Sequence, residues 1–188
     1  IMLLIIVGGI GFLVWEDICK HKWRIREYRT QSKLVLIVTA ALIVFPAVYF
    51  FFFECGDLPV GERILASLFQ SVTPRTAGFN TINLTAISDT GLYLMIILML
   101  IGGSPGSTAG GMKTTTIAVL FSSAFSVFRK KDNAEVMKRR IDDETVKTAS
   151  AVFLMYITLF LVGGMAISTI ENLPITSCLY ETASAVGT

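Results

Sequence analysis

The sequence has 188 residues, of which 53% are hydrophobic and 16% charged, and its mean hydropathy is +0.68. Soluble domains carry about 25% charged residues, so this composition excludes an ordinary soluble domain and favours a membrane protein. The net charge is only +2, but the 16 Lys and Arg residues cluster: six lie in Lys20–Lys33 and seven in Arg129–Lys147.

Three stretches predict membrane spans, because a helix needs about 20 apolar residues to cross the hydrocarbon core. Residues 34–53 and 149–170 each provide such a stretch without a charge. Residues 1–18 resemble the end of a third span. The chain opens inside an apolar run, without an initiator Met, and stops without a terminating pattern. We therefore expect it to be an internal fragment of a longer protein.

The basic blocks indicate the orientation, since cytoplasmic loops of membrane proteins carry an excess of Lys and Arg. Residues 19–33 and 129–148 are therefore expected to be cytoplasmic linkers. A nucleic-acid-binding role for these blocks is disfavoured, because they lie directly beside spans. The opposite, outer connections contain mostly acidic residues, together with two cations: Glu54, Asp57, Glu62, Arg63, Arg75, Asp89 and Glu171.

The region between the first complete span and the second basic block is unusual. Residues 59–72 are apolar but too short to cross a membrane, which favours a re-entrant pore helix, and a polar loop follows at 73–80. Residues 91–128 would form a helix about 57 Å long, nearly twice the thickness of the core. This second helix must therefore be broken, and the glycine- and serine-rich residues 102–111 mark the break.

The same order of elements then restarts. Residues 149–170 form a span, and 174–185 a second short apolar helix that opens with Pro174, as the first opens with Pro59. The sequence therefore predicts an all-α membrane protein built from repeated units of span, pore helix and span. Residues 34–128 form one such unit, and residues 149–188 begin the next.

The polar loop after the first pore helix has the properties of an ion filter. Pro74 and Gly78 prevent the helix from continuing, and the carbonyl oxygens of such a loop can replace the hydration shell of a cation. The carboxyl end of the preceding helix also favours a cation. The filter candidates, acting through their backbone carbonyls, are Thr76, Ala77, Gly78 and Phe79. The alternative is an ordinary extracellular turn.

Four strings give the sequence a specific resemblance. TPRTAGFNT and IGGSPGSTAGGMKTTT are similar to the third repeat of the KtrB/TrkH family of potassium transporters, GGIGFLVWED to the end of the second repeat, and ETASAVGT to the fourth pore helix. The KTTT ending is more similar to KtrB than to TrkH. The resemblance implies a pore-forming subunit that conducts K⁺ through four filter loops of one polypeptide. The entrance of the fourth filter would be Val186, Gly187 and Thr188.

The resemblance also implies that the glycine-rich break lies below the filter and acts as a gate. Its residues are Gly102, Gly103, Ser104, Pro105, Gly106, Ser107, Thr108, Ala109, Gly110 and Gly111, with Lys113 close behind. A phosphate-binding loop is disfavoured because Met112 separates the last glycine from Lys113. An ionisable residue such as Lys113 inside a membrane segment indicates a functional role. The alternative is a static kink in the helix.

Other functions are weaker. His21 is the only histidine and no metal-ligand spacing is present, so an enzyme is disfavoured. A sodium-coupled or sodium-conducting symporter with re-entrant loops remains the alternative. We expect no cofactor in this chain, only K⁺ as the permeant ion. The resemblance implies a nucleotide-binding regulatory ring subunit (KtrA/TrkA-like) docking near residues 129–147, the alternative being a solvated loop there. A homodimer in the bacterial inner membrane, crossing it several times, is also expected.

Overall fold

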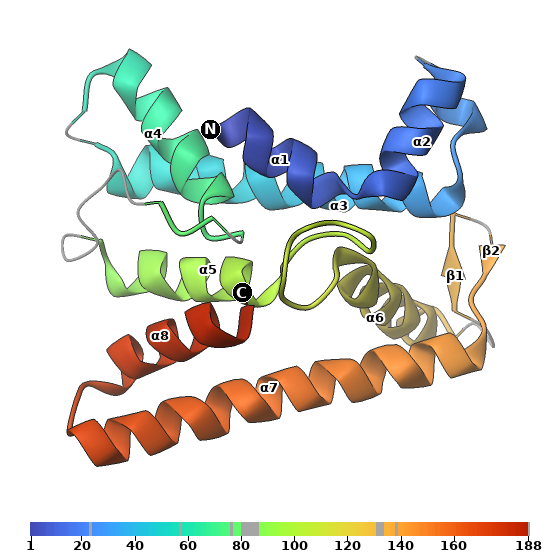
Figure 1. Ribbon diagram of the computed structural model, residues 1–188. Coiled ribbons are helices and arrows are strands. Elements are labelled where there is room, and N and C mark those ends of the chain that lie inside the picture. Colours follow the sequence, from blue (N-terminus) through green and yellow to red (C-terminus); the bar gives the residue numbers. More distant parts are fainter. Residues whose placement is uncertain are drawn as a thin grey trace.

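Figure 1 shows the computed structural model, which describes residues 1–22, 24–56, 58–75, 77–79, 87–130, 134–137 and 139–187. Most of these residues are helical. The helices are α1 (Met2–Ile10), α2 (Phe12–His21), α3 (Thr30–Tyr49), α4 (Val60–Val72), α5 (Asp89–Leu100), α6 (Thr114–Phe128), α7 (Asp143–Glu171) and α8 (Ile175–Gly187). A 3₁₀ turn covers Ile25–Glu27, and a π-helical turn, Phe50–Glu54, extends α3.

The predicted helical membrane fold is confirmed, with one small exception. Residues of the second basic block form a hairpin, in which β1 (Glu135–Val136) pairs antiparallel with β2 (Arg139–Arg140). Helix α3 with its π turn, Thr30–Glu54, and α7 are long and apolar enough to cross a membrane. The pair α1 and α2 is a third candidate, bent by 92°. The chain is therefore part of a membrane protein.

Both complete spans extend further than the apolar stretches that predict them. Helix α7 begins at Asp143 instead of residue 149, because Asp143 and Glu144 suit the positive end of a helix. It ends where Asn172 adopts a left-handed conformation, with φ 53°. Helix α3 begins at Thr30 instead of residue 34. The extra turns are polar and project the helices beyond the apolar zone.

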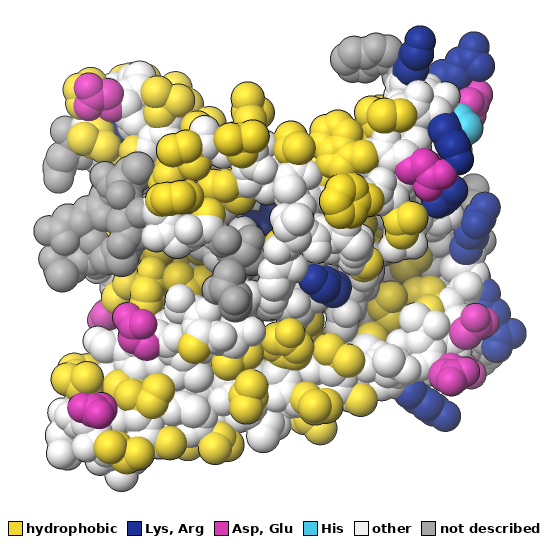
Figure 2. Space-filling model, in the orientation of Figure 1, with side chains coloured by type: hydrophobic (Ala, Val, Ile, Leu, Met, Phe, Trp, Pro, Cys, Tyr) yellow, Lys and Arg dark blue, Asp and Glu magenta, His cyan; other side chains and the backbone are white. Residues whose placement is uncertain are grey.

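Helices α3 and α7 lie along the length of the molecule, with the shorter helices between and beside them (Figure 1). Figure 2 shows most of the Lys and Arg side chains visible on this face gathered at the end that holds α2, the β1–β2 hairpin and the start of α7. The fold therefore brings the two basic blocks to one end, as a single cytoplasmic face requires.

A small core holds the helices together. Phe50, Met95, Met99, Phe160 and Ala183 pack where the π turn, α5, α7 and α8 meet. Elsewhere large hydrophobic side chains cover the exterior, especially along α7 (Figure 2). Leu154 on this helix is 66% exposed, for example. An exterior this apolar is suited to lipid or to further protein, not to water.

Two polar anchors fix the helix ends. Asp17, only 2% exposed, accepts hydrogen bonds from Ser32 Oγ at 2.6 Å and from the Arg29 backbone at 3.0 Å, and so ties α2 to the start of α3. At the opposite end, the Glu54 carboxylate accepts a hydrogen bond from the Ser88 backbone at 3.1 Å. Ser88 Oγ in turn caps α5 by accepting from the Gly91 backbone.

Candidate ion pathway

Two short helices point their carboxyl ends toward the middle of the molecule. Helix α4 packs on α3 and α8 packs on α7, and the last turns of both lie near the end of α5 (Figure 1). Each begins directly after a proline, Pro59 or Pro174, whose carbonyl accepts a hydrogen bond from the first turn. Because a helix carboxyl end is partly negative, this arrangement favours a cation in the space ahead of it.

The loop after α4 turns tightly around Thr73, which is 2% exposed. The Thr73 carbonyl accepts hydrogen bonds from the Ala77 and Gly78 backbones at 3.2 and 3.1 Å, and its hydroxyl donates to the Phe79 carbonyl at 2.6 Å. Gly78 has φ 67°, a conformation that favours glycine. Of the four filter candidates, Ala77, Gly78 and Phe79 are therefore brought together here, and Thr76 lies outside the described residues.

Arg75 does not lie in an exposed outer connection, as its position in the sequence suggested. Its side chain is only 7% exposed, and its Nη2 donates a hydrogen bond to the Gly102 carbonyl at 3.3 Å. This contact joins the loop after α4, described at residues 73–75 and 77–79, to the break between α5 and α6. We call this loop the pore loop after its expected role. The sequence gives no indication of this hydrogen bond, because Arg75 and Gly102 lie 27 positions apart.

The break between α5 and α6 is a hairpin-like excursion of residues 101–113, which we call the intramembrane loop (Figure 1). Its two ends pair through backbone hydrogen bonds, from Gly102 to Met112 at 3.0 Å and from Gly103 to Gly110 at 3.2 Å. A Cβ on Gly102 would overlap the Gly110 carbonyl, so only glycine allows this close pairing. The expected break at 102–111 thus falls within a non-helical segment.

The intramembrane loop is docked on a second break, at Gly11. The Ser104 and Thr108 backbones donate hydrogen bonds to the carbonyls of Gly9 and Gly8, at 3.0 and 3.4 Å, and the Phe12 backbone donates to Gly106 at 3.1 Å. Gly11 has φ 92°, and a Cβ there would lie 2.6 Å from the Pro105 carbonyl. The two breaks therefore satisfy each other's free backbone groups.

This break changes the expectation for residues 1–18. They do not form one straight helix end, because α1 stops at Ile10 and α2 leaves Gly11 at 92° to it. The glycine cluster before Gly11 was visible in the sequence. The segment that bonds to this cluster, the intramembrane loop, could not be identified from the sequence, because it lies about a hundred residues further along the chain.

Side chains complete the intramembrane loop. Lys113 Nζ donates a hydrogen bond to the Ala109 carbonyl at 2.7 Å, and Ser107 Oγ accepts one from the Ala109 backbone at 3.3 Å. Ser104 is fully buried, and its hydroxyl lies 3.2 Å from that of Thr114 at the start of α6. The ammonium group of Lys113 is thus held within the loop that precedes it.

The end of α8 lies against both parts of the break. The structure places Val186 and Gly187, two of the three residues expected at the fourth filter entrance, in the last helical turn of α8, and Thr188 lies outside the described residues. A Cβ on Gly187 would lie 2.5 Å from the Met99 carbonyl, and one on Gly111 would lie 3.0 Å from the Gly187 carbonyl. Helix α8 therefore meets the end of α5 and the return of the intramembrane loop.

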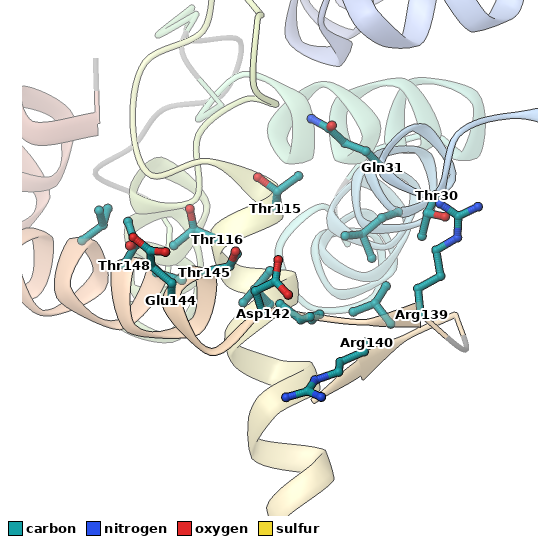
Figure 3. Close-up of a pocket in the computed structure, with 16 residues that line it drawn as sticks. Thr30, Gln31, Thr115, Thr116, Arg139, Arg140, Asp142, Glu144, Thr145 and Thr148 are labelled. Atoms are coloured by element: carbon teal, nitrogen blue, oxygen red, sulfur yellow. The ribbon is translucent and has the colours of Figure 1, made fainter. Parts of the chain in front are cut away.

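A separate cavity of about 720 Å³ opens at the basic end of the molecule, between α3, α6, α7 and the hairpin. Figure 3 shows Thr115 and Thr116 from α6 facing Thr145 and Thr148 from α7, with Arg139 and Arg140 at one side. Within the described residues, no group of three or more His, Cys, Asp or Glu side chains could hold a metal ion.

Comparison with known proteins identifies the architecture. A family model described as TrkH, cation transport protein, matches residues 1–188. The chain belongs to the TrkH family of cation transport proteins. The family is one of transporters, not of enzymes, and the resemblance noted in the sequence is confirmed.

Relatives and one solved structure agree with this assignment. The chain is 39% identical to the potassium/sodium uptake protein NtpJ of Enterococcus hirae over 98% of its length, and 34% identical to the Ktr system potassium uptake protein B of Vibrio alginolyticus, also over 98%. The crystal structure of the potassium transporter TrkH from Vibrio parahaemolyticus has the same fold, with a TM-score of 0.81 at 17% identity over 99% of this chain.

The chain spans about two fifths of these proteins: 43% of NtpJ, 42% of the Vibrio alginolyticus protein and 42% of the crystallised TrkH chain. A complete TrkH-family protein therefore contains more than the elements described above.

Proposed function

We propose that this chain is part of the pore-forming subunit of a potassium uptake system. In this proposal K⁺ crosses a filter to which each of four repeats contributes one loop, and the intramembrane loop gates the path below it. The pairs α3–α4 and α7–α8 would belong to the third and fourth repeats. K⁺ would be held by backbone carbonyls at Ala77, Gly78 and Phe79, with Thr76 and the fourth filter entrance completing the site.

The observation that supports the gate best is the position of the intramembrane loop. It follows directly from the end of α5, touches the pore loop through Arg75 and Gly102, and meets the end of α8 through Gly111. A non-helical segment at this depth is tolerated where it lines a cavity or is buried by protein. In the described residues it is joined to α1 and α2 by hydrogen bonds at Ser104, Gly106 and Thr108, and in this proposal it moves by breaking these bonds, without unfolding a helix.

The permeant ion is proposed from the relatives. Two proteins that resemble the chain are named as potassium uptake proteins, which supports K⁺. The name of NtpJ includes sodium as well as potassium, and this observation keeps a sodium-conducting or sodium-coupled transporter as the second candidate.

The setting of the pore is also proposed. The resemblance supports a homodimer in the bacterial inner membrane, with several spans in each subunit, and a nucleotide-binding regulatory ring on the basic face. The β1–β2 hairpin and the cavity lined by Arg139 and Arg140 provide polar surface on that face. Nucleotide would bind the regulatory partner alone, and no nucleic acid is involved.

Ion uptake by the full-length protein tests the proposal. The protein is reconstituted in lipid vesicles, and uptake of radioactive rubidium is measured while unlabelled K⁺ or Na⁺ is added outside. We expect K⁺ to suppress uptake at a much lower concentration than Na⁺. Equal suppression by the two ions would favour the sodium-conducting alternative, and vesicles that take up no more rubidium than empty ones would contradict both.

A further inference from the structure

We infer that Arg75 and Thr39 share one buried water molecule, and that this water-bridged contact positions the intramembrane loop against the pore loop. The water site itself is argued from the geometry alone. Its consequence for transport rests on the proposed function.

The site is a small cavity of about 10 Å³. Its walls come from five segments: α1, α3, the last residue of α4, the pore loop and the intramembrane loop, the last represented by Gly103 and Ala109. A cavity of this size holds about one water molecule, provided that two to four polar groups can bond to it.

Polar atoms that could bond to such a water are present at this cavity. Among the described residues, three buried side-chain polar atoms lack a hydrogen bond: Thr39 Oγ1, Arg75 Nε and Gln70 Oε1. Two of these three residues, Thr39 and Arg75, line this one cavity, and their side chains are 5% and 7% exposed. Leaving both atoms without a partner would cost the full desolvation of each. A water oxygen can accept from Arg75 Nε–H while a water O–H donates to Thr39 Oγ1.

The charge of Arg75 gives the water a second role. In the described part of the chain Arg75 has no ion pair, and its guanidinium donates a hydrogen bond to the Gly102 carbonyl. The guanidinium lies just beyond the carboxyl end of α4 and bonds to a carbonyl just beyond that of α5. Two partly negative helix ends therefore favour the cation, and a water dipole adds to this stabilisation. The same positive charge disfavours K⁺ in this cavity.

Arg75 is accordingly a positioning residue. It contacts the intramembrane loop directly at Gly102 and, through the water, reaches Thr39 on α3. Helix α3 is one of the long spans, so the water ties the two loops to a rigid element. Replacing Thr39 or Arg75 would weaken the attachment of the intramembrane loop without altering the carbonyl groups proposed to form the filter.

The test compares Thr39→Val, Arg75→Met and the double variant in the full-length protein. Thr39→Val removes the hydroxyl with almost no change of shape. Thr39→Ser keeps the hydroxyl, and Thr182→Val removes one that is bonded within α8, to the Cys178 carbonyl at 2.7 Å. Rubidium flux in vesicles is measured without the regulatory subunit.

We expect Thr39→Val to raise this basal flux about fivefold, the effect of losing one buried hydrogen bond from the closed state. Arg75→Met should raise it more, and the double variant should match Arg75→Met, because both residues act through one water. Thr39→Ser and Thr182→Val should resemble the parent. Independent, multiplying effects, or a Thr39→Val flux equal to that of the parent, would overturn the inference.

A cryo-EM map of the full-length protein at a resolution that shows ordered water separates this inference from the proposed function. Density for one water between Thr39 and Arg75, lost in Thr39→Val, supports the site even if the protein conducts no K⁺. An empty cavity in the parent contradicts the site even if K⁺ uptake is confirmed.

Discussion

At position 78 the backbone conformation favours glycine, although no neighbouring atom would clash with a side chain. The φ of Gly78 is 67°, yet a Cβ built on it would meet nothing within 4 Å. Gly102 is the opposite case, since its neighbour Gly110 leaves no room for a side chain. Substitution at position 78 therefore strains only the backbone of the pore loop, whereas substitution at position 102 would force two chain segments apart.

We predict that Gly78→Ser weakens ion discrimination while expression stays normal. A non-glycine residue held in the left-handed region costs about 1–3 kcal/mol, so the pore loop will shift toward a relaxed conformation. We expect the preference for K⁺ over Na⁺ to fall roughly tenfold, which corresponds to about 1.4 kcal/mol. Gly61→Ser in the first turn of α4, also without neighbours within 4 Å, is the control. An unchanged preference would remove Gly78 from the filter.

Lys113 is the residue whose charge bears most directly on gating. A cation about 4 Å from its ammonium would be repelled by about 4 kcal/mol at an effective dielectric of 20. The hydrogen bond to Ala109 holds that charge in the intramembrane loop.

We predict that Lys113→Gln increases basal ion flux in part, because the amide keeps the bulk and a donor for the Ala109 carbonyl but loses the charge. Flux into vesicles containing the full-length variant measures the effect. Lys130→Gln, at the exposed end of α6, is the control for a general loss of positive charge. A Lys113→Gln flux at or below that of the parent would show that the charge does not oppose the ion.

At the scale of the elements, the two chain breaks depend on each other. The intramembrane loop supplies donors to the carbonyls of Gly8 and Gly9, and the start of α2 supplies a donor to Gly106. The α1–α2 pair is in turn tied to α3 through Asp17. The support of the intramembrane loop therefore continues to the basic end of the molecule.

We predict that Asp17→Ala destabilises the full-length protein by about 1–3 kcal/mol, because it leaves the Ser32 hydroxyl and the Arg29 backbone without their acceptor. Thermal unfolding in detergent should show a lower Tm. Glu16→Ala is the matched control, since the adjacent Glu16 pairs with Lys20 and Arg29 at the surface, where ion pairs contribute little. Equal Tm values for the two variants would contradict the anchoring role of Asp17.

Much of this element pattern could be predicted from the sequence, and the reason is local. Apolar length predicts α3 and α7, prolines mark the starts of α4 and α8, and the glycine- and serine-rich run marks where a helix cannot continue. The docking of the intramembrane loop on Gly11 and the burial of Arg75 could not be predicted. Both depend on contacts between segments that are distant in the sequence. The sequence pattern shows where a helix must end, but not which other segment forms hydrogen bonds with the backbone groups left free there.

At the scale of the whole molecule, the distribution of charged and apolar surface defines a long axis that runs from the basic end to the opposite end. The basic blocks lie at one end, while the π turn and the α7–α8 connection lie at the other. Gly56 follows the π turn by two residues. With α3 and α7 as spans, the membrane must lie across this axis.

We predict that cysteines at positions 56 and 130 are labelled from opposite sides of the membrane. Gly56→Cys and Lys130→Cys are introduced one at a time into the full-length protein after its native cysteines, among them Cys19, Cys55 and Cys178, are replaced by alanine. An impermeant thiol reagent added to intact cells should label only position 56, and position 130 should react after the cells are opened. Labelling of both positions in intact cells would overturn the orientation.

The central claim, that the intramembrane loop gates a K⁺ pore, is tested most directly by deleting residues 104–109. The chain can close over this deletion because the Gly103 backbone is already hydrogen-bonded to the Gly110 carbonyl at 3.2 Å. The deletion removes the bonds to Gly8, Gly9 and Phe12 and the acceptor of Lys113. Rubidium flux is measured in vesicles with the full-length parent and deletion proteins, each with and without its regulatory subunit. The account predicts a higher flux in the deletion protein that no longer depends on the regulator. A correctly inserted deletion protein that conducts no faster than the parent would contradict it, and the loop would then be a static kink.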